Sequence, residues 1–335
     1  MMNLKYILLL ILTLLSVESK AQDPIFTQYF LVPETINPGF TGFLETTSAG
    51  IIHRTQWPDL NLKVDTDYAY FSTWAENANS GIGVNFLNHR ESFTGYDFLQ
   101  ANFNYAYRVE LGYDWFFRPG IEIGYGSKSF GFQNVILRDQ INITNETIAP
   151  QSIDPLRLNN RIHFIDISTG LLFYNDNLWF GTAIKHLNKP NISMAQEGNI
   201  PLDMFFNVNA GYEFELADYL DTTLFPYETR MMVTANFMKQ AEYNRLDIGS
   251  SLIFNNFIIG ATTALNPMKK TPTGHFLTSI NIFSGLQYEN FKIGFSYDMN
   301  TTKIGKTGGV FELGLVYQFD VEARKCFGCP NYSVN

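Results

Sequence analysis

The chain is poor in charge, in cysteine and in long apolar runs. Only 16% of its 335 residues are charged, whereas a soluble domain usually carries about 25%. Its two cysteines, Cys326 and Cys329, both lie near the C-terminus, which excludes a disulfide framework. A mean hydropathy of -0.08 is too low for a helical membrane protein. The net charge of -9, without a basic block, argues against a nucleic-acid partner.

Aromatic residues take up the difference, with 30 Phe, 18 Tyr and 4 Trp. After Val17 no apolar run approaches the length of about 20 residues that a membrane-spanning helix needs. The sequence therefore predicts no transmembrane helix in the body of the chain.

Residues 1–21 have the form of a signal peptide. Lys5 precedes a largely apolar stretch of twelve residues, from Tyr6 to Val17, and Ser19-Lys20-Ala21 has the small-x-small form of a cleavage site. An N-terminal transmembrane helix is the alternative, but it needs about 20 apolar residues. We expect the mature chain to start at Gln22.

Apolar and polar residues alternate along most of the chain. Between Phe206 and Leu216 every even position is apolar or aromatic, and every odd position is polar or glycine. This period of two predicts β-strands with one apolar face. The segments are about 10–14 residues long, which suits a tilted bilayer crossing better than the usual globular strand of about 5–6 residues. A soluble β-sandwich shows the same alternation and is the alternative.

The chain is predicted to be all-β, an outer-membrane antiparallel β-barrel over residues 44–319 with about fourteen strands. We expect the strands near 47–57, 64–74, 80–90, 96–109, 114–126, 161–174, 177–187, 204–217, 228–239, 245–254, 257–265, 275–286, 290–298 and 309–319.

The predicted connections alternate in length. Very short ones at 175–176, 255–256 and 287–289 alternate with long ones, which are 127–160, 188–203, 266–274 and 299–308. Outer-membrane barrels have short periplasmic turns and longer external loops. This pattern places both termini in the periplasm, including a C-terminal tail over residues 320–335.

Residues with catalytic or ligand-binding potential form no recognisable site. The five histidines, which are His53, His89, His163, His186 and His275, have no metal-ligand spacing. Charged residues are expected to face a hydrated lumen: Glu213, Glu215, Asp247, Asp298, Glu312, Lys292, Arg54 and Arg108. For the tail pair Cys326 and Cys329 a local disulfide or free thiols are expected; redox exchange and half a zinc site are the alternatives. We therefore predict no enzyme activity, no cofactor and no metal.

Several stretches resemble a known family. The mature N-terminus reads Gln22-Asp23-Pro24-Ile25-Phe26-Thr27-Gln28-Tyr29-Phe30, followed by Ile36-Asn37-Pro38-Gly39-Phe40-Thr41-Gly42. A strand-end motif follows at Arg54-Thr55-Gln56-Trp57-Pro58. Together these resemble the PorP/SprF family of type IX secretion system membrane proteins. Gly39-Phe40 departs mildly from the family pattern, and so does the tail after Phe319.

The resemblance implies a barrel in the outer membrane of a Gram-negative bacterium. Its partners would be other type IX secretion components, outer-membrane lipid and a secreted cargo protein with a C-terminal sorting domain, such as a gliding adhesin. The alternative is a channel for small hydrophobic ligands resembling the long-chain fatty acid transporters, which Asn37-Pro38 also fits. Gln28-Tyr29 and the Arg54, Gln56 and Trp57 motif favour the secretion family.

Two further regions are candidates for function. Residues 22–43 are too irregular for a strand and too aromatic for a free linker, so we expect a plug or docking segment in the lumen or over its periplasmic mouth; a frayed leader is the alternative. The loops 127–160 and 188–203 carry apolar groups suited to binding a protein partner or to forming a lid: Phe130, Phe132, Ile136, Leu137 and Met194.

Overall fold

The computed structural model of the protein describes most of the chain after residue 22. The described residues are 23–112, 114–131, 136–153, 161–195, 197–219, 229–268, 275–302 and 307–319. The predicted signal peptide, Gln22, Phe132 and the tail with Cys326 and Cys329 lie outside them. Among the described residues, no helix is long and apolar enough to cross a bilayer.

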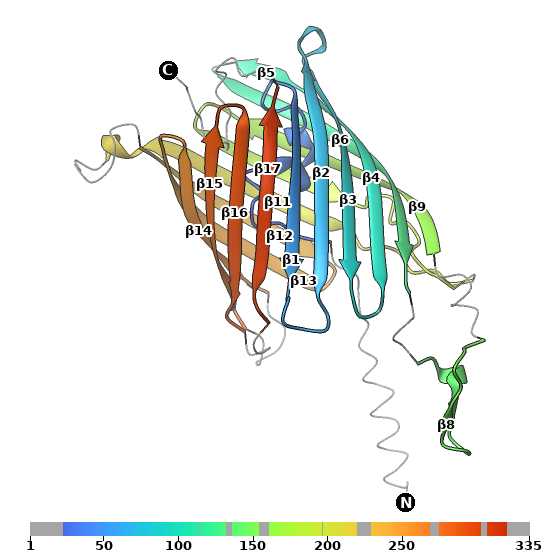
Figure 1. The fold of residues 1–335 in the computed structure, drawn as a ribbon. Helices are drawn as coiled ribbons and strands as arrows, with labels where there is room; N and C mark the ends of the chain where they lie inside the picture. The colour runs from blue at the N-terminus through green and yellow to red at the C-terminus, as the bar shows by residue number, and fades with distance from the viewer. Residues whose placement is uncertain are drawn as a thin grey trace, which may run out of the picture.

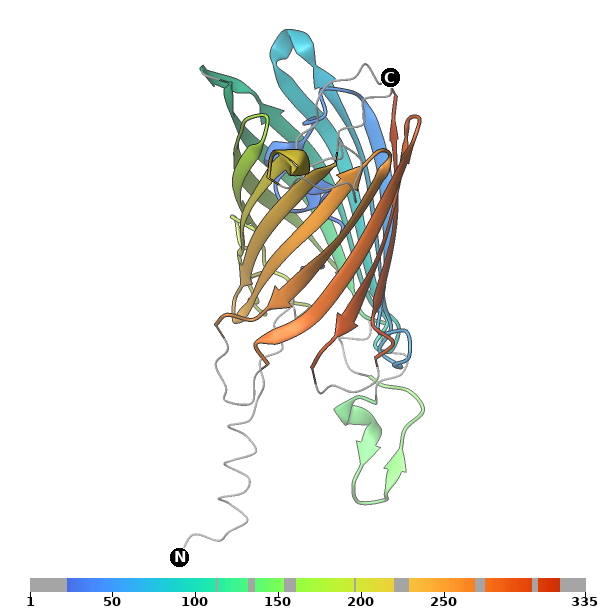
Figure 2. The ribbon, with the colours of Figure 1, turned by 90° about the vertical axis from the view of Figure 1, so that its left-hand side faces the viewer.

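Fourteen antiparallel strands form a closed barrel, as predicted (Figures 1 and 2). The barrel strands are β1 (Ser48–Gln56), β2 (Val64–Ala75), β3 (Ser80–Glu91), β4 (Tyr96–Tyr107), β6 (Trp115–Ser129), β9 (Arg161–Tyr174), β10 (Leu178–Lys185), β11 (Phe205–Glu215), β12 (Arg230–Gln240), β13 (Tyr243–Phe254), β14 (Phe257–Leu265), β15 (Leu277–Tyr288), β16 (Phe291–Asn300) and β17 (Val310–Gln318). Each pairs with its neighbours along the chain, and β1 pairs with β17 to close the wall. The short β5 (Val109–Gly112) continues β4 alongside β6.

Alternating side chains give the wall an apolar outside and a polar inside. On β11, Phe206, Val208 and Tyr212 are exposed on the outer surface, whereas Asn207 and Asn209 are buried in the lumen. The Asn207 amide donates across the sheet to Asn236 Oδ1 at 2.7 Å. Because hydrocarbon cannot satisfy these amides, this alternation is the pattern of a barrel that spans a membrane.

The connections sort by length mostly as predicted. One end of the barrel carries the short turns at 76–79, 175–177, 255–256 and 289–290; the other carries the long connections 130–160, 186–204, 266–276 and 301–309. We call these the short-turn end and the long-loop end. The connection 216–229 is an exception at the short-turn end, and 92–95 and 241–242 are short turns at the long-loop end.

The outer face of β1 to β4 becomes polar towards the long-loop end. His53 and Asp67 form a pair there with a 2.7 Å contact, and Arg90 lies 3.3 Å from Asp97. These side chains are half exposed, and charged groups facing hydrocarbon are costly. This polar part of the wall is therefore distinct from the apolar band that would face hydrocarbon.

A small hairpin projects from the long-loop end. It consists of η4 (Arg138–Gln140), β7 (Ile141–Asn142) and β8 (Thr147–Ile148), and its two strands pair only with each other. Figures 1 and 2 show it extending away from the barrel. Its exposed side chains are therefore presented on the outer side of the molecule.

Residues 23–43, which we call the lumenal segment, lie inside the barrel. Most of its 21 residues are buried. The exceptions are residues 23–25, Pro33 and Thr35, which are partly exposed. Two short 3-10 turns, η1 (Pro33–Thr35) and η2 (Pro38–Phe40), give the segment its compact form.

The direction of the lumenal segment was not foreseen. Asp23 bonds to Gln240, which ends β12, and to His186, which follows β10, so it lies at the long-loop end. Phe43 contacts Tyr174 at the short-turn end, where the chain turns into β1. The prediction that both ends of the mature chain lie on the short-turn side is therefore wrong for the described start of the chain, because the segment runs the length of the lumen.

Candidate functional site: the lumenal segment and the long-loop end

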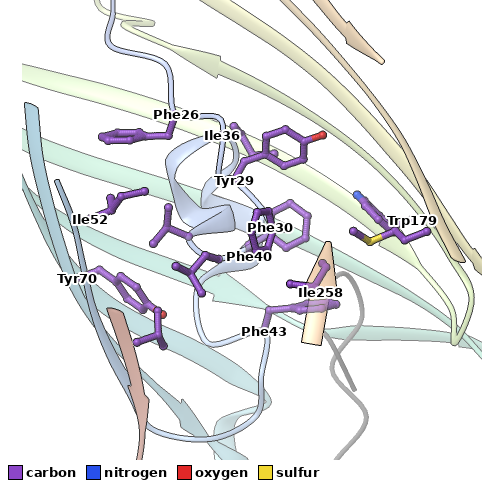
Figure 3. Close-up of a cluster of buried hydrophobic side chains, with 14 of the residues drawn as sticks. Phe26, Tyr29, Phe30, Ile36, Phe40, Phe43, Ile52, Tyr70, Trp179 and Ile258 are labelled. Carbon is purple, nitrogen blue, oxygen red and sulfur yellow. The ribbon is translucent and has the colours of Figure 1, made fainter. Parts of the chain in front are cut away.

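The main hydrophobic core of the protein lies in the lumen and is centred on the lumenal segment (Figure 3). The segment contributes Phe26, Tyr29, Phe30, Leu31, Val32, Ile36, Phe40 and Phe43. Phe30 stacks at 4.8 Å on Phe283 of β15, and Phe26 lies 6.0 Å from Tyr68 of β2. Full burial of one such side chain stabilises by about 1.5–3 kcal/mol, so the segment and the wall form one hydrophobic unit.

Proline and asparagine define the shape of the segment. Pro33 and Pro38 open the two 3-10 turns. A backbone N–H at the first position of a turn has no partner within the turn, so proline, which lacks this N–H, loses no hydrogen bond there. Asn37 caps the second turn, since its Oδ1 accepts from Gly39 N at 2.8 Å. The same amide donates to Leu171 O and Thr182 O at 3.0 and 3.3 Å. Asn37 therefore joins the segment to β9 and β10.

A buried charge cluster binds the first turn of the segment. Glu312 of β17 accepts from Thr27 N at 2.9 Å and from Gln28 N at 3.0 Å. Asp298 accepts from the Thr27 hydroxyl at 2.8 Å. Arg54 of β1 forms an ion pair with Glu312 and lies 3.3 Å from Asp298. The single guanidinium of Arg54 thus offsets part of the charge of the two carboxylates, and Glu312 satisfies backbone N–H groups that would otherwise lack partners.

A second polar cluster holds Asp23 at the long-loop end. His186 Nε2 lies 2.9 Å from Asp23, and its Nδ1 lies 2.8 Å from Asp166 of β9. A carboxylate only accepts hydrogen bonds, so both ring nitrogens must donate and the imidazole is charged. Because His186 begins the connection 186–204, this cluster links the segment directly to a long loop.

Two wall glycines make room for the segment. A Cβ at Gly170 of β9 would lie 1.9 Å from Asn37 Oδ1, and one at Gly81 of β3 would lie 1.9 Å from Thr41 O. These separations are far below contact distance, so a larger residue at either position would displace the segment. Gly42, with a φ of 62°, in turn passes so close to the wall that its own Cβ would meet Gly81 Cα at 2.7 Å.

Arg118 of β6 anchors the segment near the short-turn end. Its side chain is fully buried, bonds to Thr41 O and lies over the rings of Phe43 and Trp74 at 5.7 and 5.1 Å. A desolvated guanidinium gains about 2 kcal/mol or more from an aromatic face. The ring of Phe43 therefore offsets part of the cost of burying this charge.

The predicted motif residues fall into two groups. Asp23, Gln28, Tyr29, Asn37 and Gly42 meet the wall in the lumen, and Arg54 joins them through Glu312. Pro24 lines a lumenal cavity of about 30 Å³ and Phe26 and Pro38 belong to the buried segment. Gln56 and Trp57 lie apart at the end of β1, where Trp57 N donates to Gly309 O at 3.0 Å. The charge partners Glu312 and Asp298 were expected only to face the lumen, because sequence alone gives no register between β17 and the segment.

The predicted inward orientation of charged residues holds with one correction. Asp247, Asp298, Glu312, Lys292 and Glu213 are buried in the lumen, whereas Glu215 is exposed. Glu215 ends β11 at the short-turn rim, where the alternation stops. Within the described ranges, no three histidine, cysteine or acidic side chains are grouped so as to hold a metal ion.

The long loops do not present all of the predicted residues in the same way. Phe130 lies 5.0 Å from Tyr96 and close to Lys128, so it packs onto the rim. Leu137 precedes η4 on the projecting hairpin and is half-buried, as is Met194. In the connection 186–204, Ile192 and Leu202 are buried against Phe164, which makes that loop partly a lid.

The most exposed apolar groups of the long loops are isoleucines, of which Ile136 alone was among the predicted residues. On and beside the hairpin, these are Ile136, Ile141, Ile143, Ile148 and Ile153. Ile143 and Ile153 are 87% and 88% exposed. The sequence feature that could have indicated them is a group of apolar β-branched residues within a polar stretch.

The fold and the lumenal site define an outer-membrane β-barrel whose interior is filled by its own N-terminal segment. The sequence profile of the type IX secretion system membrane protein PorP/SprF matches residues 18–317. The chain belongs to this family and lies in the outer membrane, as a membrane protein of type IX secretion.

Three solved structures are remotely similar to this chain. Omp33 of Acinetobacter baumannii is 8% identical, with 83% of this chain and 100% of that chain covered and a TM-score of 0.42. A FadL homologue of Pseudomonas aeruginosa is 9% identical, with 85% and 93% covered and a TM-score of 0.44. The KdgM porin is 9% identical, with 82% and 99% covered and a TM-score of 0.36. No curated protein matches the chain.

Proposed function

We propose that this protein is an accessory barrel of type IX secretion that binds one secreted cargo protein at the cell surface and supports its delivery or retention. The cargo would carry a C-terminal sorting domain, and the protein would act beside other type IX components without being an enzyme. Family membership supports the setting. The contact itself is inferred from the exposed external surface.

The exposed isoleucines of the projecting hairpin carry this proposal. Monomeric proteins rarely leave grouped apolar side chains in water, and such groups mark contact sites. Ile141 and Ile148 are paired across the two hairpin strands, and Ile143 lies in the tip between them. Figure 2 shows the hairpin extending away from the strands of the barrel, so lipid around the barrel wall is not expected to cover these side chains. A protein partner would bury them.

The filled lumen disfavours the alternative of a channel for small hydrophobic ligands. A small-molecule site usually has about 300–1,000 Å³. Among the described residues, two cavities beside the lumenal segment have volumes of about 10 and 30 Å³. Both are bounded by the segment's own aromatic rings, Phe26 and Phe40 among them.

Site-specific photocrosslinking in living cells tests the cargo contact. A crosslinking amino acid at Ile143 or Ile153 should give one predominant high-mass adduct that mass spectrometry identifies as a secreted protein. The matched control is Leu62, which is 46% exposed in a different connection at the same end. The same adducts at Leu62, or no adduct at either isoleucine, would contradict the proposal.

A further inference from the structure

A hollow of about 530 Å³ lies on the outer wall at the short-turn end, far from the hairpin. Residues of β6, β10 and β11 and of the turns beside them line it: Trp115, Asn175, Asn177, Leu178, Tyr212, Phe214, Glu215, Asp218 and Tyr219. Leu178 and Tyr212 are exposed on the outward face and lie opposite each other across the β10–β11 pair. The hollow therefore faces the membrane at its periplasmic boundary, not the lumen.

Aromatic rings form the walls of this hollow. Tyr212 and Phe214 stack at 5.6 Å, and Tyr219 meets Phe214 edge-on at 5.1 Å. The two ring contacts join the three side chains into one aromatic wall. Tyr219 belongs to the chain that follows η6 (Leu216–Asp218) and remains 65% exposed. Aromatic faces around an open space are suited to receive a cation.

The polar groups of the hollow have one sign of charge. Glu215 and Asp218 supply two carboxylates, and none of the nine lining residues is Lys, Arg or His. In the described part of the chain, no ion pair joins either carboxylate to a cationic side chain. Arg230 lies opposite Glu215 across the β11–β12 pair, but its ion pair is with Glu213. Asn177 donates its amide to Glu213 O at 3.1 Å and keeps its own side-chain oxygen as an acceptor.

We propose that this hollow binds the amine headgroup of a phospholipid of the periplasmic leaflet. The ammonium group would lie between the rings and the two carboxylates, while the acyl chains run along Leu178 and Tyr212 on the apolar wall. Aromatic side chains at a barrel's membrane boundary are a general feature, but a recessed aromatic site with unneutralised carboxylates is selective for a cation. The chemistry excludes a headgroup that is only anionic.

Native mass spectrometry of the mature protein released from detergent micelles tests this assignment. The probes are phosphatidylethanolamine and phosphatidylglycerol with identical acyl chains. The parent protein should retain the ethanolamine lipid about tenfold better, as expected for one cation–aromatic contact with charge pairing. Equal retention of the two lipids would overturn the assignment.

Variants locate the site. Tyr219→Ala with Asp218→Asn and Glu215→Gln should reduce retention of the ethanolamine lipid to that of the glycerol lipid. The control is Tyr288→Ala with Glu289→Gln, which removes an exposed tyrosine and a carboxylate from another turn of the same rim and should change nothing. Heat-modifiable gel mobility confirms that each barrel is folded. Loss of selectivity in the control as well, or its persistence in the triple variant, would refute the site.

Discussion

Asn37, Glu312 and His186 show how single residues join the lumenal segment to the wall. Each satisfies groups on both partners: Asn37 bridges a turn to two strand carbonyls, Glu312 accepts two backbone N–H groups, and His186 lies between two carboxylates. Removing one partner from such a buried set costs more than the average hydrogen bond contributes, because the groups left behind cannot reach water. Stability of the segment therefore depends on a few residues.

Gly170 and Asn37 should be energetically coupled. Gly170→Ala places a methyl group against the Asn37 carboxamide, so unfolding free energy should fall by about 1–3 kcal/mol through overpacking. Asn37→Ala removes the obstacle at the cost of its own hydrogen bonds. In the double variant the loss should be clearly smaller than the sum of the single losses. Urea unfolding in lipid, followed by tryptophan fluorescence, measures all four proteins, and additive losses would contradict this packing.

The lumenal segment is the element that distinguishes this barrel from an open pore. The wall behind it carries many polar side chains, such as Asn207, Asn236 and Asp247, which water could solvate if the segment were absent. The wall is also closed by strand pairing alone. We therefore expect the barrel to remain folded without the segment.

Deleting residues 23–42 should raise ion conductance in planar bilayers. The deletion removes the rings that fill the lumen and exposes a polar interior of fourteen strands. A matched control is Tyr29→Phe, which removes only the 2.8 Å hydrogen bond to Thr234 and should leave conductance low. Unchanged conductance in a folded deletion variant would mean that the segment does not block passage.

Part of this element was predictable and part was not. Its aromatic residues, with proline and glycine between them, predict burial without regular structure, and the lumen was one of the two expected places. Its direction depends on contacts such as Asp23 with His186 and Thr27 with Glu312, which are 163 and 285 residues apart. No local pattern encodes such pairs, so sequence reasoning left them undetermined.

At the scale of the whole molecule, strand number and order followed from the sequence because lipid imposes a strict period of two on every crossing. The same reasoning failed for the connection 216–229, since loop length is not constrained by the bilayer. It also did not single out Ile141, Ile143 and Ile148 of the hairpin, because sequence alone does not show which apolar loop residues remain exposed. The sequence therefore predicts the strands, because the bilayer imposes their pattern. Which loop side chains are exposed to a partner becomes clear only from the structure.

The orientation of the barrel can be tested by labelling on intact cells. An epitope at Asn145, in the tip of the projecting hairpin, should be labelled, whereas one at Asp176, in the turn between β9 and β10, should be labelled only after the outer membrane is permeabilised. The reverse pattern, or labelling at both sites without permeabilisation, would contradict the assignment of the long-loop end to the exterior.

Quantitative proteomics of the surface and medium fractions tests the central claim most directly. Ile143→Ser with Ile153→Ser removes two exposed anchors, which should weaken one contact about tenfold or more without disturbing the barrel. Surface retention or release of one secreted protein should change in this variant, with all other exported proteins and a Leu62→Ser control unaffected. Loss of every exported protein would instead mark a core part of the export channel, and unchanged profiles would show that the hairpin does not bind cargo.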